Sequence, residues 1–137
     1  MIFPLDSMKQ IDSEGARIVS IDGKGPNRDR QDHSHCHHVV FNDQYLYVAD
    51  LGTDTLSVYR FDPNQGELEL HGDRIETDAG AGPRHLIFHP DKPLIFVANE
   101  LDSTVNVYRV DTSAGQLTFL EKHSTRREHD CQGDFSM

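Results

Sequence analysis

The sequence has no tryptophan, only two cysteines, and few basic residues for its number of acidic ones. Asp and Glu total 23 against 13 Lys and Arg, which gives a formal net charge of −10. This balance argues against nucleic acid or an anionic membrane as the main partner, because both are bound by cationic surfaces. Cys36 and Cys131 lack the close spacing of metal-binding cysteines, so we expect a reducing, cytoplasmic setting.

Long apolar runs are also missing. No uninterrupted apolar run approaches the roughly 18 residues that a membrane span requires. The first fifteen residues lack the basic start and apolar core that are typical of a signal peptide. With 36% hydrophobic and 26% charged residues, the composition is that of a globular chain without a membrane partner.

Short β-rich runs separated by turn residues fill most of the chain, and a helical period is hard to find. Such runs are typical of antiparallel strands joined by tight turns. The first group of runs is 38–41, 45–49, 56–61 and 67–70, and the second is 85–89, 94–98, 104–110 and 116–120. The second group repeats the order of the first.

A shift of 49 residues superimposes the two groups. It gives nine identities among the 23 positions from 48 to 70, including Val58-Tyr59-Arg60 on Val107-Tyr108-Arg109. Four short strands repeated every 40 to 50 residues or so are the pattern of a β-propeller. A small β-sandwich is the alternative architecture.

The predicted fold class is therefore all-β, as a fragment of a propeller built from four-stranded antiparallel sheets. A closed ring takes about four to eight blades, and the chain holds about two and a half. We expect an outer half blade at 1–22, one blade at 23–77 and another at 78–122. An irregular or disordered tail is expected at 123–137, which lacks alternation.

Charged residues fall opposite one another around the expected hairpins. The start of a blade's first strand and the end of its second strand meet at the same rim of the central channel. Arg84 and Glu100 are each eight residues from Lys92, so we expect them side by side. His37 and Asp50 should form the matching pair one blade earlier. Arg84 and Glu100 are either an ordinary salt bridge or a site in which Arg84 grips an anionic substrate.

An insert at 27–37 is rich in histidine. His33, His35 and His37 alternate, so they share one face if this segment is extended. They are candidates for metal ligands, although no acidic or thiol ligand has diagnostic spacing. They are equally candidates for general acid–base catalysis or for a hydrogen-bonded channel lining. Cys36 points to the opposite face and is expected to be a buried, inert thiol.

The core is predicted from the alternating apolar positions. His38 is expected to pack against it. Its predicted members are Val39, Phe41, Leu46, Val48, Tyr59, Leu86, Phe88, Ile95, Val97 and Tyr108.

Several short motifs, in order and correctly spaced over 1–122, resemble the lactonase family of seven-bladed β-propellers. That family contains bacterial-type 6-phosphogluconolactonase and the fungal carboxymuconate cycloisomerase. The motifs are Gly25-Pro26-Asn27 with Arg30-Gln31, Ser34-His35-Cys36-His37 where the family commonly has His-Pro-His, Ala49-Asp50-Leu51-Gly52-Thr53-Asp54, Gly80-Ala81-Gly82-Pro83-Arg84-His85-Leu86, Phe88-His89-Pro90-Asp91 and Asn99-Glu100-Leu101.

The resemblance implies hydrolysis of a sugar-acid lactone such as 6-phosphogluconolactone, in the pentose phosphate pathway, with no metal or other cofactor. The family's proposed catalytic residues fall on His35 or His37, Arg84 and Glu100. Arg84 would bind the substrate's phosphate or carboxylate and stabilise the oxyanion. A histidine would activate water, and Glu100 would position Arg84 or share the proton transfer.

Asp50 and His85 are expected to join Arg84 in binding this anionic small-molecule lactone. Two other functions stay open at this point. One is a cycloisomerase that acts on a dicarboxylate at the same site. The other is a non-enzymatic interaction module whose open blade edges self-associate.

Overall fold

The computed structural model describes residues 2–5 and 8–126 of the chain. Within these residues there are nine strands and no helix, so no helix is available there to cross a membrane. The first sheet contains β1 (Cys36–Asn42), β2 (Tyr45–Asp50), β3 (Thr55–Asp62) and β4 (Glu67–Leu70), with β5 (Ile75–Glu76) paired to β3. The second contains β6 (Pro83–Phe88), β7 (Leu94–Asn99), β8 (Thr104–Asp111) and β9 (Gln116–Ser124).

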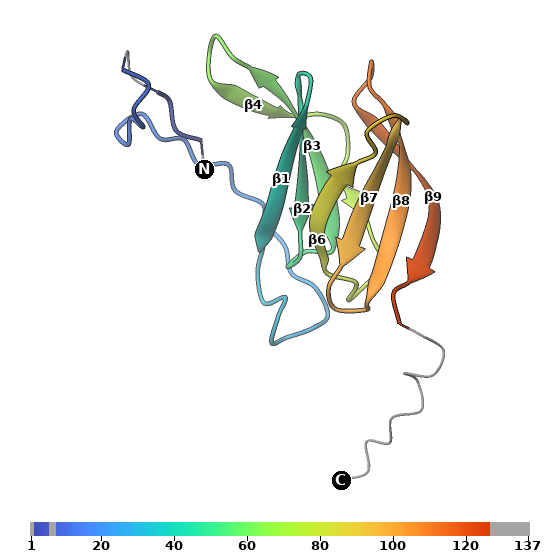
Figure 1. The fold of residues 1–137 in the computed structure, drawn as a ribbon. Coiled ribbons are helices and arrows are strands. Elements are labelled where there is room, and N and C mark those ends of the chain that lie inside the picture. Colours follow the sequence, from blue (N-terminus) through green and yellow to red (C-terminus); the bar gives the residue numbers. More distant parts are fainter. Residues whose placement is uncertain (1, 6–7, 127–137) are drawn as a thin grey trace.

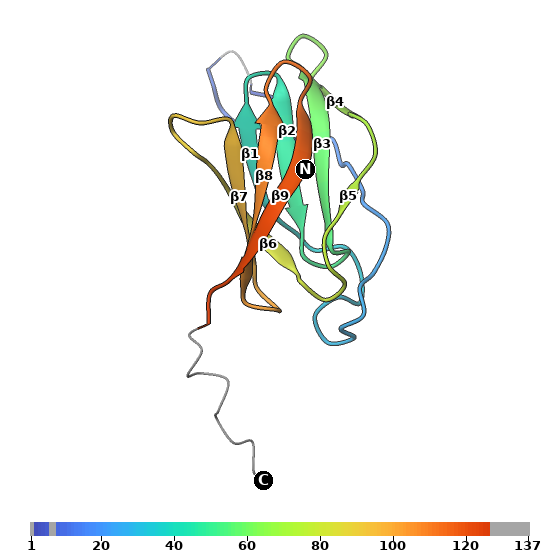
Figure 2. The ribbon, with the colours of Figure 1, turned by 90° about the vertical axis from the view of Figure 1, so that its right-hand side faces the viewer.

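All strand pairs are antiparallel, and all follow chain order except the pair of β5 with β3. The two sheets pack face to face as two layers (Figures 1 and 2). The prediction of an all-β chain built from four-stranded antiparallel sheets is confirmed.

The sequence repeat is matched by a repeat of backbone conformation in the turns. Asp54 and Ser103, which are 49 residues apart, have φ values of 54° and 58°. Gly66 and Gly115 form a second such pair, at 63° and 67°. Glycine suits this left-handed conformation because it has no Cβ to clash. The two sheets therefore share their turn chemistry as well as their strand order.

The main core lies between the two sheets. Its fully buried members come from both layers: Tyr45, Tyr47, Ala49, Leu56, Val58, Leu86, Ile95, Val97, Tyr108 and Val110. Burying one such large apolar side chain contributes about 1.5–3 kcal/mol. The packing is therefore strong enough to hold the two sheets in register.

Most of the predicted core is confirmed, but Val39 and Phe41 are 50% and 54% exposed. Both project from β1 to the outer face of the first sheet, away from the second sheet. Phe88 and His38 are half-buried. Alternation identified which residues share a face, but it could not tell which of two apolar faces would be covered.

The two ends of the chain depart from the regular blades. Between the described residues of the N-terminal segment there are two antiparallel bridges, Ile2 with Arg17 and Leu5 with Ile11, and the half blade at 1–22 stays a prediction. β9 continues through Ser124, where it pairs with Thr104, so the tail does not begin at 123 as expected. The side chains of this outer strand are mostly exposed, which removes the alternation that would have revealed it. Residues 127–137 lie outside the described part.

Candidate active site at the channel rim

A bulge interrupts the first strand of each sheet at the same place. In the first sheet Cys36 pairs with Asp50 and His38 with Ala49, which leaves His37 without a partner in the ladder. In the second sheet Arg84 is left out in the same way. Bulges re-aim side chains and are frequent beside active sites. Since β1 and β6 contact each other, the two re-aimed side chains meet at the rim that lies at the bottom of Figure 1.

Arg84 lies at the centre of a cluster at this rim. Its Nε is 2.7 Å from Glu100 Oε2 and donates a hydrogen bond to His37 Nε2 at 3.0 Å. Arg30 Nη2 donates to the other oxygen of Glu100. We call Arg30, His37, Arg84 and Glu100 the rim cluster. The expectation that Arg84 and Glu100 lie side by side is confirmed.

The charges of the rim cluster favour the binding of an anion. The hydrogen bond from Arg30 lowers the pKa of Glu100, and the charges of Arg30 and Arg84 lower it further against the opposing effect of burial. Glu100 is therefore ionised at neutral pH. Two guanidinium groups and one carboxylate leave a net positive charge on a chain whose total is −10. The side chains of Arg30 and Arg84 remain 49% and 42% exposed, so solvent and ligands can reach them.

His35 lies with His33 in a group separate from His37, because the segment is not extended as a shared face of all three histidines would require. Its Nε2 is 3.0 Å from Asp32 Oδ1, and His33 Nδ1 is 2.9 Å from the same oxygen. These hydrogen bonds, from His35 first and then from His33, lower the pKa of Asp32. Residues 31–35 form no strand, so the alternation of side chains that a strand would impose does not hold there.

Asp50 neither pairs with His37 nor lies where it could bind a substrate, contrary to both sequence predictions. It is 1% exposed, and its Oδ1 accepts backbone hydrogen bonds from His35 at 2.8 Å, Gly52 at 2.9 Å and Thr53 at 3.2 Å. Ser34 Oγ hydrogen-bonds to Oδ2. The expected pair with His37 does not form, because the bulge places Cys36 opposite Asp50. With both oxygens engaged and buried, this carboxylate holds the loop and is not placed to bind a substrate.

His85 is exposed beside the rim cluster. Its ring centroid is 5.4 Å from that of His37 and 5.3 Å from that of His38. Cys36 is exposed rather than buried and lines an apolar groove on the outer face of the first sheet. Partial burial and then the charge of Asp50 raise the pKa of its thiol, which agrees with an inert role.

Three residues that position the rim cluster were not identified as functional from the sequence. Arg30 completes the cluster, and its place in the Arg30-Gln31 motif was the available signal. Gln31 is fully buried and anchors the loop through hydrogen bonds to Leu51 O at 2.9 Å and from Asn27 N at 3.1 Å. Asp54 accepts the N–H groups of residues 80 and 82 at 2.7 and 2.8 Å and so fixes the loop that leads to Arg84.

Repeated four-stranded antiparallel sheets, packed face to face with charged residues at the ends of their first strands, define the chain as part of a β-propeller. The family model "Lactonase, 7-bladed beta-propeller" matches residues 1–136. The chain belongs to this lactonase family, and the resemblance seen in the sequence motifs is confirmed.

Similar proteins include a curated 6-phosphogluconolactonase and proteins of solved structure. Over 76 residues the chain is 46% identical to a 6-phosphogluconolactonase of Xenorhabdus nematophila, a match that covers 55% of this chain and 23% of the relative. A protein from Lactobacillus plantarum has a TM-score of 0.82 at 31% identity, covering 92% of this chain and 36% of that one. The periplasmic gluconolactonase of Pseudomonas aeruginosa has a TM-score of 0.75 at 32% identity, with 92% and 35% covered. The chain thus spans between 23% and 36% of the length of these relatives.

Proposed function

We propose that this chain supplies part of the active site of a 6-phosphogluconolactonase-like enzyme, which hydrolyses a sugar-acid lactone. The observation that carries the proposal is the rim cluster, in which two arginines flank Glu100 beside His37. Membership of the lactonase family and the similarity to a 6-phosphogluconolactonase support lactone hydrolysis as the reaction.

Lactone hydrolysis needs a group that stabilises negative charge and a group that activates water. Water adds to the ring carbonyl, an oxyanion forms, and the ester C–O bond then breaks to give a hydroxy acid. Among the described residues, the partners of Arg84 contact its Nε only. Its two terminal nitrogens can therefore bind the substrate's phosphate or carboxylate, or the oxyanion. Glu100 acts as the positioning residue that holds both guanidinium groups.

His37 is the better placed of the two candidate bases. Its Nε2 accepts a hydrogen bond from Arg84, so the lone pair of Nε2 faces the anion-binding group. When Arg84 turns towards a bound anion, this lone pair becomes available to a water molecule. His35 is engaged with Asp32 instead, so we assign it no proton transfer.

The first test measures turnover of 6-phosphogluconolactone against spontaneous hydrolysis. Removing one electrostatic donor typically costs about 10²–10³ in kcat, so Arg84→Ala should lower turnover by that factor. Arg60→Ala is the matched control, because Arg60 is an exposed arginine on β3, outside the rim cluster. No turnover above background, or equal losses in the two variants, would count against the proposal.

A dicarboxylate is the second substrate class, because two guanidinium groups can pair with two carboxylates. It corresponds to a carboxymuconate-type cycloisomerase, which would use the same rim cluster. Turnover of carboxymuconate in place of the sugar lactone would favour this alternative.

The cytoplasm is the location that we propose, because the sequence has only two cysteines and reducing compartments keep thiols unpaired. The Pseudomonas aeruginosa neighbour is periplasmic. Fractionation of cells that produce the tagged chain distinguishes the two locations.

A further inference from the structure

Asp32, His33 and His35 form a compact set of ligand atoms outside the rim cluster. One ligand atom from each lies within 4.8 Å of the others. Asp32 Oδ1 is 2.9 Å from His33 Nδ1 and 3.0 Å from His35 Nε2, and the two rings are 4.1 Å apart. We propose that these three residues bind a divalent transition metal ion of the Zn²⁺ type.

The donor set selects the class of metal. Two imidazole nitrogens and one carboxylate oxygen suit Zn²⁺, Ni²⁺ or Cu²⁺, whereas Mg²⁺ and Ca²⁺ prefer oxygen ligands. Zinc bonds of about 2.0–2.2 Å place tetrahedral ligands about 3.3–3.5 Å apart. The two distances from Asp32 Oδ1, 2.9 and 3.0 Å, need to lengthen by only a few tenths of an ångström, and the two histidine nitrogens already lie within 4.8 Å of each other. The exposure of the side chains, 38% for His35 and more for the others, leaves a coordination position for water or another ligand.

The backbone that carries these ligands is already fixed. The buried Asp50 accepts the His35 N–H at 2.8 Å, and the fully buried Gln31 precedes Asp32 directly. Gly52 packs so closely on the loop that a Cβ there would lie 1.8 Å from the carbonyl oxygen of His33. Such surrounding contacts orient metal ligands in known sites. Binding therefore orders side chains only and does not require the loop to fold.

The test is calorimetric titration of the untagged chain with Zn²⁺, in a Cys36→Ser, Cys131→Ser background that removes thiol ligands. One ion per chain should bind, Mg²⁺ should not compete, and His33→Ala or Asp32→Asn should weaken the affinity by about tenfold or more. His123→Ala is the control, because His123 also pairs with a carboxylate, Glu121, at an exposed site. The electron paramagnetic resonance spectrum of bound Cu²⁺ should show coupling to two nitrogens.

No Zn²⁺ binding, or equal effects of the His33 and His123 substitutions, would overturn the metal site. Circular dichroism of each variant without metal checks that the fold is kept. Because this readout is binding alone, its failure would leave the lactone proposal unaffected.

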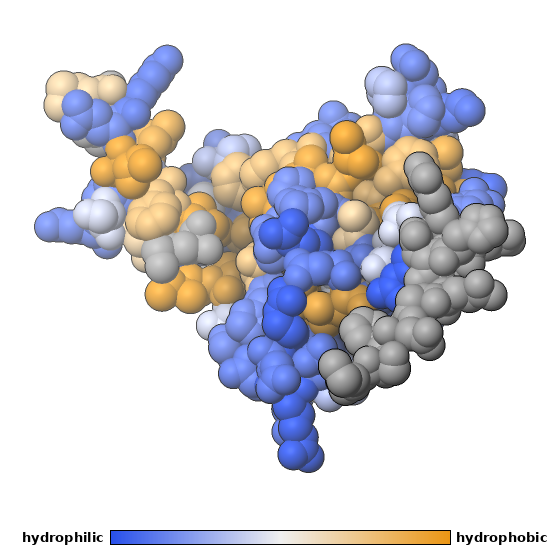
Figure 3. All heavy atoms as spheres, turned by 60° about the horizontal axis from the view of Figure 1, so that its bottom comes forward, coloured by the Kyte–Doolittle hydropathy of each residue, from blue (hydrophilic) through white to orange (hydrophobic). Residues whose placement is uncertain are grey.

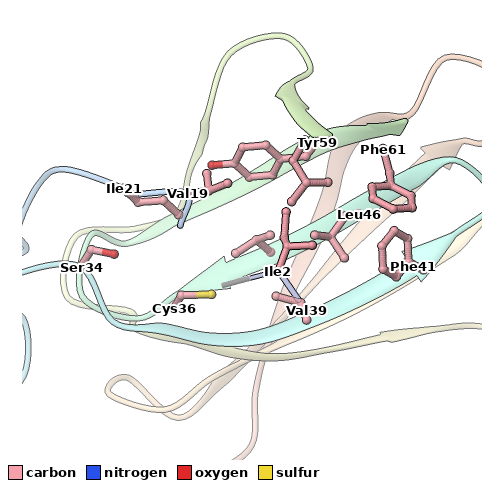
Figure 4. Close-up of a pocket in the computed structure, with 12 residues that line it drawn as sticks. Ile2, Val19, Ile21, Ser34, Cys36, Val39, Phe41, Leu46, Tyr59 and Phe61 are labelled. Atoms are coloured by element: carbon pink, nitrogen blue, oxygen red, sulfur yellow. The ribbon is translucent and has the colours of Figure 1, made fainter. Parts of the chain in front are cut away.

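A second, independent observation concerns the outer faces of the two sheets. The first sheet carries an apolar groove of about 360 Å³ on the face turned away from the second sheet, where side chains of β1, β2 and β3 meet (Figure 4). By strand register, six of the residues that line it correspond to the second-sheet residues that pack on the first sheet. These six are Val39, Phe41, Leu46, Val48, Tyr59 and Phe61, and their counterparts are Leu86, Phe88, Ile95, Val97, Tyr108 and Val110. Ile2, Val19 and Ile21 of the N-terminal segment also line the groove.

The outer face of the second sheet corresponds in the same way to the inner face of the first sheet. Ile87, Phe96 and Ala98 of the second sheet occupy the positions of Val40, Tyr47 and Ala49, which pack between the sheets. Ile87 is 67% exposed, and hydrophobic side chains are visible on the surface to both sides of a central hydrophilic strip (Figure 3). We propose that a second copy of this chain docks there, repeating the packing between the sheets in a head-to-tail manner.

Complementary variants test this docking. Val39→Lys places a charge in the groove of the first sheet, and Ile87→Lys places one on the outer face of the second sheet. Each variant alone should be monomeric by sedimentation velocity, whereas the unmodified chain should associate. A mixture of the two should form a one-to-one dimer, because each retains the face that the other lacks. Ile11→Lys is the control, since Ile11 is 69% exposed in the N-terminal segment. A monomeric unmodified chain, or a mixture that stays monomeric, would overturn the interface.

Discussion

The two sheets have the same backbone conformation at the rim, but the carboxylates there have different roles. Asp50 ends β2 and is buried, with its oxygens committed to the loop before β1. The same position in the second sheet is Asn99, which is also buried and donates to Thr104 Oγ1 at 2.9 Å. There the carboxylate comes one residue later, at Glu100, and pairs with two arginines. A shift of one residue along the strand end thus separates a carboxylate that holds the fold from one that organises a site.

The largest effect expected from this comparison is on stability. Asp50→Ala removes a buried charged acceptor of three backbone hydrogen bonds, and bonds to charged groups contribute about 1.5–3 kcal/mol each. We expect the free energy of unfolding to fall by about 3 kcal/mol or more, measured by urea denaturation. Asn99→Ala, which removes one hydrogen bond between neutral side chains, to Thr104, should cost about 1 kcal/mol. Equal losses would show that the two rims do not differ as described.

Glu100→Gln should show the reverse pattern. Its ion pairs are partly exposed, and such pairs contribute about 0–1 kcal/mol, so urea denaturation should change little. Turnover of the lactone should fall about tenfold, because the arginines lose the charge that positions them. The loss should appear mainly in kcat, and Glu100→Asp should restore part of it. A loss of stability without a change in kcat would contradict the positioning role.

The pH dependence of stability gives a second test of the Glu100 ion pairs. The pKa of Glu100 is lowered in the folded chain by Arg30 and Arg84. A carboxyl whose pKa is lower in the folded state stabilises it above the unfolded pKa, about 4.3 for Glu, and loses that effect as the pH falls through the folded pKa. The difference in unfolding free energy between the unmodified chain and Glu100→Gln should therefore be constant near neutrality, begin to shrink as the pH falls below about 4.3, and vanish below the folded pKa of Glu100.

Substitution of Cys36, at the rim of the first sheet, is expected to have the smallest effect on lactone turnover. Its raised pKa keeps the thiol protonated, so in a Cys131→Ser background it should react with iodoacetamide more slowly than free cysteine at pH 8 or so. Cys36→Ala should leave lactone turnover unchanged. Rapid alkylation with loss of turnover would assign the thiol to the site.

The sequence was sufficient for the features that depend on local spacing. The 49-residue repeat predicted two like sheets, and counting from the turn at Lys92 correctly placed Arg84 beside Glu100. The same count failed for His37 and Asp50, although both sheets carry the bulge. Asp50 corresponds to Asn99, one residue before the position of Glu100, and its carboxylate is held by the loop while His37 turns towards Arg84. The histidine alternation failed for a related reason, since 31–35 is a loop held by Asp50 and not a strand.

Turn residues and apolar alternation by themselves determined most of the strands and their order, because each depends on neighbours within a few residues. The resemblance of the short motifs indicated the family. Which carboxylate is buried, which histidine reaches Arg84 and which apolar face is left open were decided only by the tertiary structure. These outcomes depend on contacts between segments tens of residues apart, such as Arg30 with Glu100, and no local pattern encodes them.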